Sequence, residues 1–359
     1  MTASEFKRIS AAPGGPATVK QVAARAGVSP ATVSRVLAGN YPVATGTRRR
    51  VLRVVRELHY VANSHARALR GSGAPQIGFV LGDVLGQPFA LAATGAEREA
   101  AARGHLCVVG LSGHRPDREP AVVQSMREQG AAAVILIGGV VEDARYRDRM
   151  AEVAHGLEAA GSRLVLCGRP LPGPELPATV VEYDNEGGAY AATSHLLARG
   201  HRAILYLGGD PAHTTTAGRT AGYRRALADS VGPGAELIER VEFARRPVRD
   251  RVARLLREGP PFTAVFGETD VVASAAMAAI LDAGLRVPED ISVLGYDDSE
   301  LAQDLRPALT TVRVPYEEMG RLAVRLALGL RNGEHSADEQ RQLLGTGLVP
   351  RETVAPASR

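Results

Sequence analysis

The 359-residue sequence contains only two cysteines, Cys107 and Cys167. Each follows or ends an apolar, strand-like run, which favours reduced core residues over a disulfide. No uninterrupted apolar run reaches the roughly 18 residues of a membrane span. The N-terminus also lacks a basic segment followed by an apolar run. We therefore expect no membrane span and no signal peptide, and we expect the protein to stay in the cytoplasm.

The sequence also lacks the common catalytic and metal-binding motifs. It contains no G-x-S-x-G, Walker A or H-E-x-x-H motif, and no G-x-G-x-x-G between a strand and a helix. Its nine histidines are scattered without metal-ligand spacing. We therefore expect no catalytic residue, no metal ligand and no cofactor.

Lysine is scarce, and arginine supplies nearly all the positive charge. Residues 1–74 contain twelve Lys and Arg residues against Glu5 and Glu57, a net charge of +10. The whole chain has a net charge of +4, so residues 75–359 carry −6. Such segregation is typical of a protein in which one small module faces nucleic acid phosphates.

The basic end predicts three short helices. Residues 1–17 are small, polar and rich in Pro and Gly, which indicates a flexible tail. Thr18 and Gln21 have capping-box spacing, so a helix should begin there and end near Gly27. Ser29 as N-cap and Pro30 in the first turn predict a second helix to about residue 38. Two helices across one glycine turn form a helix-turn-helix, and a third helix is expected over 47–58.

From residue 76 onward the pattern changes to apolar strands alternating with amphipathic helices. This alternation predicts parallel α/β sheets. One series of strands is expected at 77–81, 106–110, 133–137 and 163–167. A second series is expected at 179–183, 203–209, 236–241, 264–266 and 291–296, and a strand-like segment follows at 342–349. Two similar halves imply two lobes with a ligand cleft between them.

These segments together resemble the LacI/GalR family of bacterial transcription regulators over about residues 18–355. TVKQVAARAGVSPATVSRVLAG is similar to the family's head signature, and HYVANSHARALRG to its hinge. YDNEGGAYAATSHLLARGH, GRTAGYRRAL, LRVPEDISVLGYDDS and RPALTTVRVPYEEMG resemble core segments in the expected order. The resemblance implies a helix-turn-helix head and a periplasmic-binding-protein-like core of two Rossmann-like lobes. It also implies a homodimer on a pseudo-palindromic operator, with a hinge whose order depends on the ligand.

The resemblance implies a set of DNA-binding residues. Pro30, Ala31 and Arg35 match the base-reading positions, and Arg35 can donate two hydrogen bonds to guanine or contact a phosphate. Thr18, Ser29, Thr32 and Ser34 are short hydroxyl residues that can cap helices or contact phosphate, and capping is favoured for the first two. The hinge positions are Asn63, Ala66, Leu69 and Arg70. Leu69 matches the leucine that family members insert into the minor groove, at a central CG step.

Three residues depart from the family's pattern. Ala38 replaces the usual asparagine after the recognition helix, Ala44 replaces the serine cap of the third helix, and Ala62 replaces the proline before the hinge. Thr45 or Thr47 could recover the missing cap, which is typically worth about 1 kcal/mol.

The resemblance also implies an effector site in the cleft. Arg219 and Asp297 match positions that hold polar ligand groups, although an interlobe salt bridge is the alternative. Phe89, Phe243 and Tyr316 match apolar or stacking walls, and Thr269 and Asp270 match a loop after a second-lobe strand. The sequence has no Trp and few aromatics, whereas sugar sites often stack a ring on an aromatic side chain. A sugar is still the expected effector, with purines and other metabolites as alternatives.

We therefore expect a sequence-specific transcription regulator controlled by a small molecule, and a repressor in particular. The alternatives are an activator and a transport-type solute-binding protein. The expected parts are a tail (1–17), a head (18–62), a hinge helix and linker (63–74) and a core (75–359). Lobe 1 is expected at about 75–178 and 313–341, and lobe 2 at about 179–312 and 342–359. The C-terminus VPRETVAPASR has no heptads, which favours a dimer over a tetramer.

Overall fold

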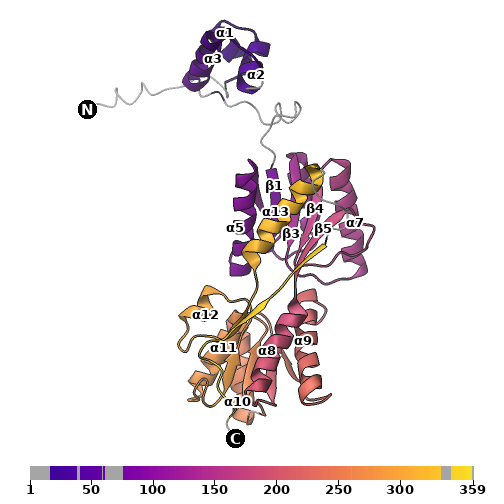
Figure 1. The fold of residues 1–359 in the computed structure, drawn as a ribbon, viewed down its shortest axis with the longest axis vertical. Helices are drawn as coiled ribbons and strands as arrows, with labels where there is room; N and C mark the ends of the chain where they lie inside the picture. The colour runs from indigo at the N-terminus through magenta and orange to yellow at the C-terminus, as the bar shows by residue number, and fades with distance from the viewer. Residues whose placement is uncertain are drawn as a thin grey trace, which may run out of the picture. The chain divides into compact units, whose positions relative to one another are not determined.

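A computed structural model describes residues 17–38, 41–58, 60, 76–259, 261–332 and 341–357. The chain divides into two compact units, Met1–Ala74 and Pro75–Arg359, which we call the head and the core (Figure 1). The predicted hinge residues Asn63, Ala66, Leu69 and Arg70, together with the substituted Ala62, lie outside the described residues.

The described residues of the head form the helices α1 (Val19–Ala26), α2 (Pro30–Ala38) and α3 (Thr45–Glu57). The first two confirm the predicted helix-turn-helix. Gly27 ends α1 with φ of 64°, a left-handed conformation that favours glycine. The small core of the head is made of valines and alanines, namely Val22, Ala23, Ala26, Val33, Val36, Val51 and Val54.

The start of α3 differs from the expectation. The helix begins at Thr45, two residues before the predicted position, and Ala44 is the N-cap residue without a side-chain hydrogen bond. The prediction that Thr45 or Thr47 restores the cap is therefore wrong. Both threonines lie inside the first turn, where their hydroxyls do not occupy the capping position.

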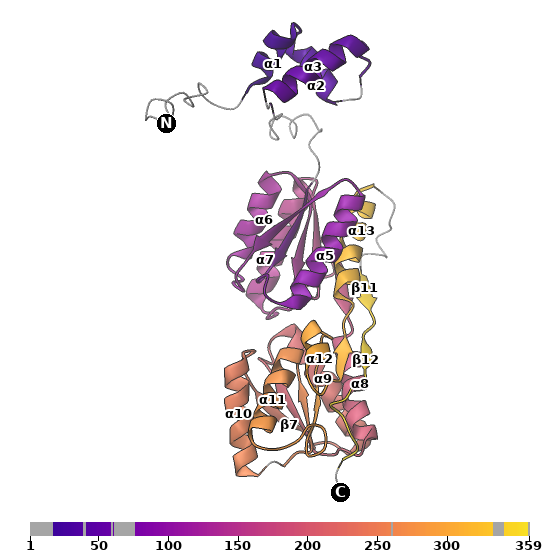
Figure 2. The ribbon, with the colours of Figure 1, turned by 90° about the vertical axis from the view of Figure 1, so that its left-hand side faces the viewer.

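Lobe 1 of the core is a six-stranded parallel sheet in the order β11-β5-β4-β3-β1-β2. Helices α5 and α13 cover one face, and α6 and α7 cover the other (Figure 2). The strands are β1 (Gln76–Leu81), β2 (Leu106–Leu111), β3 (Ala131–Ile137), β4 (Arg163–Cys167), β5 (Ala178–Tyr183) and β11 (Arg341–Leu344). The helices are α5 (Gln87–Ala102), α6 (Glu119–Glu128), α7 (Ala144–Ala159) and α13 (Tyr316–Asn332).

Lobe 2 is a four-stranded parallel sheet in the order β7-β6-β8-β9, accompanied by an antiparallel pair of β10 and β12. Its strands are β6 (Ile204–Gly208), β7 (Leu237–Arg240), β8 (Ala264–Gly267), β9 (Ser292–Leu294), β10 (Thr311–Arg313) and β12 (Gly347–Val349). Its helices are α8 (Asn185–Ala198), α9 (Thr214–Ser230), α10 (Arg245–Glu258), α11 (Asp270–Asp282) and α12 (Glu300–Asp304). The sequence predicted neither α12 nor β10.

Two segments that the sequence analysis placed in lobe 2 belong to the sheet of lobe 1. Strand β5 pairs with β4, and β11 pairs with β5. The expected strand at 342–349 is two strands, because residues 345–346 separate β11 from β12. The hydropathy of a segment does not show which lobe's sheet it joins, because strands on either side of a crossover have the same apolar pattern. The chain consequently passes between the lobes at residue 184, at 314–315 and at 345–346, and we call these segments the three crossovers.

The pair of helices over lobe 1 requires glycine at its contact. A Cβ atom on Gly95 of α5 would lie 1.9 Å from the carbonyl oxygen of Glu317. A Cβ atom on Gly320 of α13 would lie 1.9 Å from the carbonyl oxygen of Ala92. The two helices therefore approach backbone to backbone, which only glycine permits at these positions.

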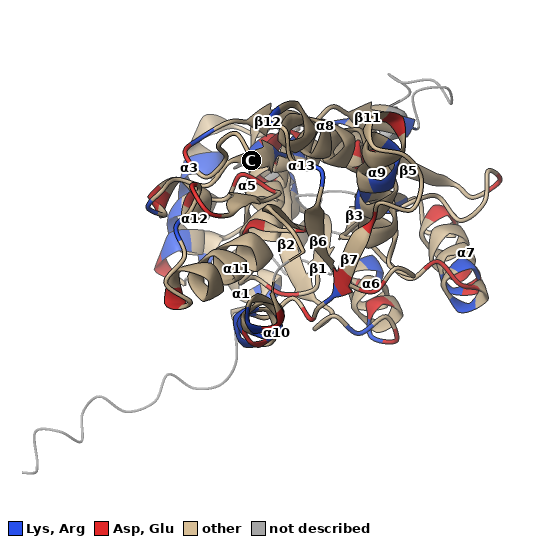
Figure 3. Cartoon of the chain, turned by 90° about the horizontal axis from the view of Figure 1, so that it is seen from below, with Lys and Arg blue, Asp and Glu red and all other residues tan. Residues whose placement is uncertain are grey.

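Both cysteines are free thiols, as predicted, with Cys167 buried and Cys107 partly buried on the edge strand β2. Burial raises the pKa of Cys107 to about 11. None of the described helices is long and apolar enough to cross a membrane. Basic and acidic residues lie on outer helices such as α7 and α10, whereas the strands of the core are mostly uncharged (Figure 3).

Candidate functional site

The first helix of the head is fixed by the predicted capping box. The Thr18 hydroxyl accepts a hydrogen bond from the Gln21 backbone at 3.3 Å, and the Gln21 side chain accepts one from the Thr18 backbone at 2.7 Å. Removing such a cap typically costs about 1 kcal/mol. Thr18 therefore has a structural role that accounts for its residue type.

The second helix presents the predicted base-reading face. Pro30, Ala31 and Arg35 are all exposed, while Val33 and Val36 are buried against the rest of the head. An exposed Arg35 is free to extend its fork of donors toward a base edge or a phosphate.

The hydroxyl residues around the start of α2 bond to one another. Ser29 Oγ accepts a hydrogen bond from the Thr32 backbone at 3.1 Å, and the Ser29 and Thr32 hydroxyls are 2.9 Å apart. Ser29 therefore caps the recognition helix, as expected. Ser34 is partly buried on the same helix. Contacts of Thr18, Ser29, Thr32 and Ser34 with phosphate stay a prediction.

Helix α3 carries more of the positive charge of the head than α2 does. Helix α2 has one charged residue, Arg35, whereas five exposed arginines lie on α3, namely Arg48, Arg49, Arg50, Arg53 and Arg56. The base-reading face on α2 therefore has one charged side chain, whereas α3 carries abundant positive charge. This combination predicts a DNA affinity that depends strongly on salt concentration.

In the core, the carboxyl ends of both parallel sheets face each other across the crossovers. The strand order reverses between β1 and β3 in lobe 1 and between β6 and β8 in lobe 2. Open α/β sheets bind ligands outside the carboxyl ends of strands at such reversals. The fold therefore puts a candidate ligand cleft between the two lobes.

Three of the predicted effector residues meet in this cleft. Arg219 of α9 donates to Asp297 Oδ1 at 3.3 Å, and the Tyr316 hydroxyl donates to the same oxygen at 2.7 Å. Arg219 and Asp297 both belong to lobe 2, so their contact is not an interlobe salt bridge. Tyr316 begins α13 of lobe 1 and supplies the link between the lobes.

Asp297 combines an uncommon backbone conformation with a buried carboxylate. Its backbone has φ of 116°, which is uncommon for a residue with a side chain. Burial raises the pKa of Asp297, although the charge of Arg219 and the Tyr316 hydroxyl oppose the change. Backbone strain and a buried charge at one residue are typical of a functional site.

Asp270 and Thr269 have structural partners. Asp270 accepts hydrogen bonds from the Thr311 hydroxyl at 2.5 Å and from the backbone of Ser299 at 2.7 Å. Burial, with Asp297 nearby, raises the pKa of Asp270 to about 7. Thr269 is the N-cap of α11 and accepts from the Val272 backbone at 3.2 Å. Neither residue has a described contact with Arg219.

The two predicted phenylalanines lie apart from this cluster. Phe89 lies in the first turn of α5 and packs beside the His114 ring, with ring centroids 6.2 Å apart. Phe243 is 49% exposed and lies against Gly209, where a Cβ atom would be 2.7 Å from its ring. The structure does not bring Phe89 or Phe243 into contact with Arg219 or Asp297, so their roles as ligand walls stay predictions.

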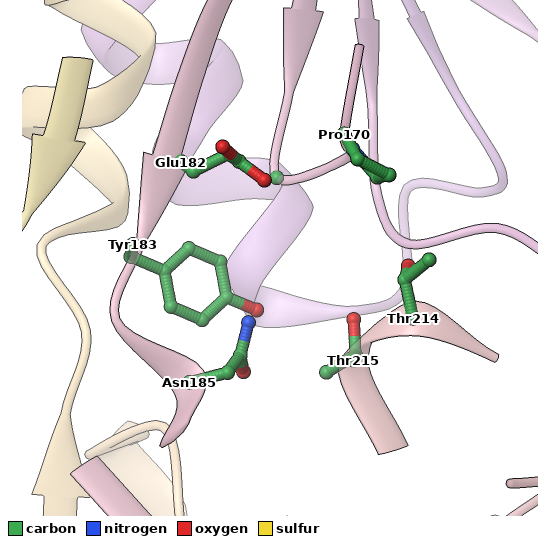
Figure 4. A pocket seen from close by; sticks show the side chains of 7 residues that line it. Pro170, Glu182, Tyr183, Asn185, Thr214 and Thr215 are labelled. Carbon is green, nitrogen blue, oxygen red and sulfur yellow. The ribbon is translucent and has the colours of Figure 1, made fainter. Parts of the chain in front are cut away.

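A cavity of about 270 Å³, including the solvent at its mouth, lies beside the cluster. Gly168, Pro170, Glu182 and Tyr183 line it from lobe 1, and Asn185, Thr214 and Thr215 line it from lobe 2. Figure 4 shows the Tyr183 hydroxyl, the Asn185 amide and the Thr215 hydroxyl directed toward the same space. The lining offers several hydrogen-bond donors and acceptors but a single formal charge, that of Glu182.

None of the seven predicted effector residues lines this cavity. Two of its lining residues nevertheless bond to Arg219, because Asn185 Oδ1 accepts from Nε at 2.9 Å and the Tyr183 hydroxyl accepts at 3.3 Å. Tyr183 is the last residue of the expected strand at 179–183. The rule that ligands bind at the carboxyl ends of parallel strands could therefore have found it. Thr214 and Thr215 precede Arg219 by about one helical turn.

Direct contacts also join the lobes around the cavity. The Thr214 backbone donates to the Val140 carbonyl at 2.8 Å, and the Thr214 hydroxyl accepts from the Val140 backbone at 3.0 Å. Elsewhere, the Gln87 side chain of α5 accepts from the Glu300 backbone at 2.9 Å. Hydrogen bonds other than those of the Arg219 cluster therefore join the two lobes in this structure.

A buried ion pair supports the lobe 1 side of the cleft. Arg169, whose side chain is 3% exposed, donates to Glu119 at 3.2 Å and to the carbonyls of Ile137 and Gly138 at 2.9 Å. The pair thus fixes the loop after β3 and the segment after β4 that lines the cavity. Among the described residues, no three His, Cys, Asp or Glu side chains gather where they could hold a metal ion.

Comparison with known proteins agrees with this architecture. Residues 18–63 match the family described as bacterial regulatory proteins, lacI family, and residues 193–354 match the periplasmic binding protein-like domain. The HTH-type transcriptional regulator DegA of Bacillus subtilis is 31% identical over 94% of this chain and 98% of its own length.

Two solved structures extend the similarity to the fold. A Lac repressor dimer bound to operator and the anti-inducer ONPF is 27% identical, with a TM-score of 0.81 over 95% of this chain and 100% of that chain. A complex of the transcriptional regulator CelR with cellobiose is 30% identical, with a TM-score of 0.67 over 94% of this chain and 99% of that chain.

The helix-turn-helix head, the two-lobed α/β core and the near full-length relatives all lead to one assignment. This chain belongs to the lacI family of bacterial regulatory proteins and is a DNA-binding transcription regulator.

Proposed function

We propose that the protein is a repressor whose operator affinity is controlled by a sugar or related metabolite bound between the two core lobes. The observation that carries this proposal is the polar cavity, whose lining comes from both lobes and includes two residues, Tyr183 and Asn185, that bond directly to Arg219. A ligand there would contact the two lobes at once and could change their relative position. We assign the protein a regulatory function and no catalytic activity.

On DNA, we propose that Pro30, Ala31 and Arg35 read bases, with the arginines of α3 adding attraction to phosphates. Leu69 would act as the minor-groove wedge of a hinge formed by 63–74, with Asn63, Ala66 and Arg70 around it. The operator would be pseudo-palindromic with a central CG step, and the protein would act in the cytoplasm, where its DNA lies.

A neutral, hydroxyl-rich effector fits the cavity best. Its lining offers the hydroxyls of Tyr183, Thr214 and Thr215, the Asn185 amide and the Glu182 carboxylate. Arg341 pairs with Glu182 at 3.0 Å, which leaves little net charge to attract an ionic ligand. The CelR structure contains cellobiose, so a sugar also agrees with a relative. A purine is the second candidate.

We propose that the protein acts as a homodimer, because β2 is an exposed apolar edge of the lobe 1 sheet. Leu106, Val109 and Leu111 of this strand are 59%, 48% and 44% exposed. An unpaired apolar edge strand favours association, and a second copy of the chain would cover it.

The effector proposal can be tested by thermal unfolding of the full-length chain with added cellobiose, ribose or adenine. A ligand that binds only the folded core raises the midpoint, and a concentration 100 times Kd stabilises by about 2.7 kcal/mol. The same ligand should release the protein from its operator in a fluorescence anisotropy assay.

Asp297→Ala should abolish the thermal shift, because it removes a partner of Arg219. The matched control is Glu239→Gln, which alters a partly exposed ion pair with Arg251 on lobe 2. If neither sugar changes the unfolding midpoint and adenine does, the sugar assignment is wrong.

A further inference from the structure

The first crossover is tied to one buried guanidinium. Residue 184 lies between Tyr183, the last residue of β5 in lobe 1, and Asn185, the first residue of α8 in lobe 2. Arg219 donates to both side chains, to Asn185 Oδ1 at 2.9 Å and to the Tyr183 hydroxyl at 3.3 Å. It therefore holds the chain on both sides of this crossover.

The second crossover reaches the same guanidinium through a carboxylate. Residues 314–315 lead from β10 in lobe 2 to Tyr316, where α13 of lobe 1 begins. Tyr316 and Arg219 donate to the same oxygen of Asp297. A movement of α13 relative to lobe 2 would therefore disturb the bond between Arg219 and Asp297.

The third crossover is connected through an aromatic ring. The Thr346 hydroxyl, between β11 and β12, donates to the carbonyl of Asp184 at 3.2 Å, and the Tyr296 hydroxyl donates to the same carbonyl at 3.4 Å. The Tyr296 ring centroid lies 3.7 Å from Cζ of Arg219. This contact is a cation–π interaction, which is strongest where water is excluded.

Arg219 uses four of its five N–H donors in contacts within the core. Its side chain is 2% exposed, and its remaining bond goes to the carbonyl of Glu268 in lobe 2. A buried guanidinium that loses partners incurs a desolvation penalty. The bonds of the guanidinium to Tyr183, Asn185 and Asp297 are therefore costly to lose, and they involve the first and second crossovers.

We infer that Arg219 is a positioning residue that holds the three crossovers together and thereby sets the relative orientation of the two lobes. This role goes beyond contact with an effector and does not require one. Tyr183 and Asn185 line the cavity and also hold Arg219, so a ligand bonded to either residue would act on all three crossovers.

The test is hydrogen–deuterium exchange of the full-length protein, without ligand, for wild type, Arg219→Lys and Arg169→Lys. Both arginines are buried and paired with a carboxylate, but Arg169 bonds only within lobe 1. Lysine keeps the charge and loses the planar fork of donors. Arg219→Lys should raise exchange about tenfold at 184–188, 295–299, 314–319 and 344–348, since one or two hydrogen bonds are lost.

Exchange in the interiors of β3 and β8 should not change. Arg169→Lys should raise exchange only near 119, 138 and 169. The segment 344–348 is decisive, because none of its residues bonds directly to Arg219 and it is joined to that residue through Tyr183, Asp184 and Tyr296. If Arg219→Lys raises exchange in α9 alone, or equally throughout the core, the inference is overturned.

A milder pair of variants decides the matter if Arg219→Lys does not fold. Asn185→Ala removes the acceptor of Arg219 Nε and should raise exchange severalfold at all three crossovers. Asn185→Asp keeps an acceptor oxygen there and should restore the wild-type pattern. Equal exchange in the two Asn185 variants would contradict the proposed role.

Discussion

Glu119→Gln tests whether the buried ion pair stabilises the cleft side of lobe 1. The Arg169 and Glu119 side chains are 3% and 12% exposed, and their contacts are 3.2 Å long. Removing one partner of a buried pair typically costs about 3–5 kcal/mol, because the other charge stays buried. Glutamine keeps one acceptor oxygen, so we expect a cost of about 3 kcal/mol, near the lower limit.

The assay is thermal unfolding of the core followed by circular dichroism. A loss of about 3 kcal/mol corresponds to a midpoint lower by about 6–12 °C for a domain of this size. The control is Glu239→Gln, which breaks a bidentate pair whose side chains are 32% and 26% exposed. Such a pair is worth at most about 1 kcal/mol. If both variants lower the midpoint equally, the contribution of an ion pair to the free energy of unfolding does not depend on its burial, and the reasoning is refuted.

Two further predictions concern packing and pH. Gly95→Ala should lower the free energy of unfolding by about 3 kcal/mol, because its Cβ would overlap the Glu317 carbonyl oxygen. Gly46→Ala, where no atom lies within 4 Å, should raise it by up to about 1 kcal/mol, and denaturant titration compares the two. The raised pKa of Asp270, about 7, means that the folded state keeps a proton that the unfolded state has lost. The stability of wild type relative to Asp270→Asn should therefore fall as pH rises from about 4 to about 7, and a flat difference would contradict the assignment.

The local signals of the head were sufficient to predict its helix-turn-helix. The starts and ends of its first two helices depend on residues that act within one helical turn, namely Thr18, Gly27, Ser29 and Pro30. A local sequence pattern is therefore enough to predict them. The start of α3 was mispredicted because two threonines offered a capping pattern that the backbone does not use.

The core was predictable as alternating strands and helices but not as two assigned lobes. Strands β5 and β11 join the sheet of lobe 1 through pairing with distant segments, which no local pattern encodes.

For the candidate site, the resemblance predicts Arg219, Asp297 and Tyr316, and the structure brings these three side chains into contact. It missed Tyr183 and Asn185, whose contacts with Arg219 depend on how the crossovers fold.

The central claim, that this chain is an operator-binding regulator, is tested most directly by DNA binding at two salt concentrations. The DNA is a family-like palindromic operator with a central CG step, compared with random sequence, for wild type and Leu69→Ala. Wild type should prefer the operator by roughly a thousandfold or more, and its affinity should fall steeply with salt. Leu69→Ala should lose most of the preference and keep salt-dependent, nonspecific binding. Failure of wild type to prefer this operator, or any sequence selected from a random library, would contradict the account.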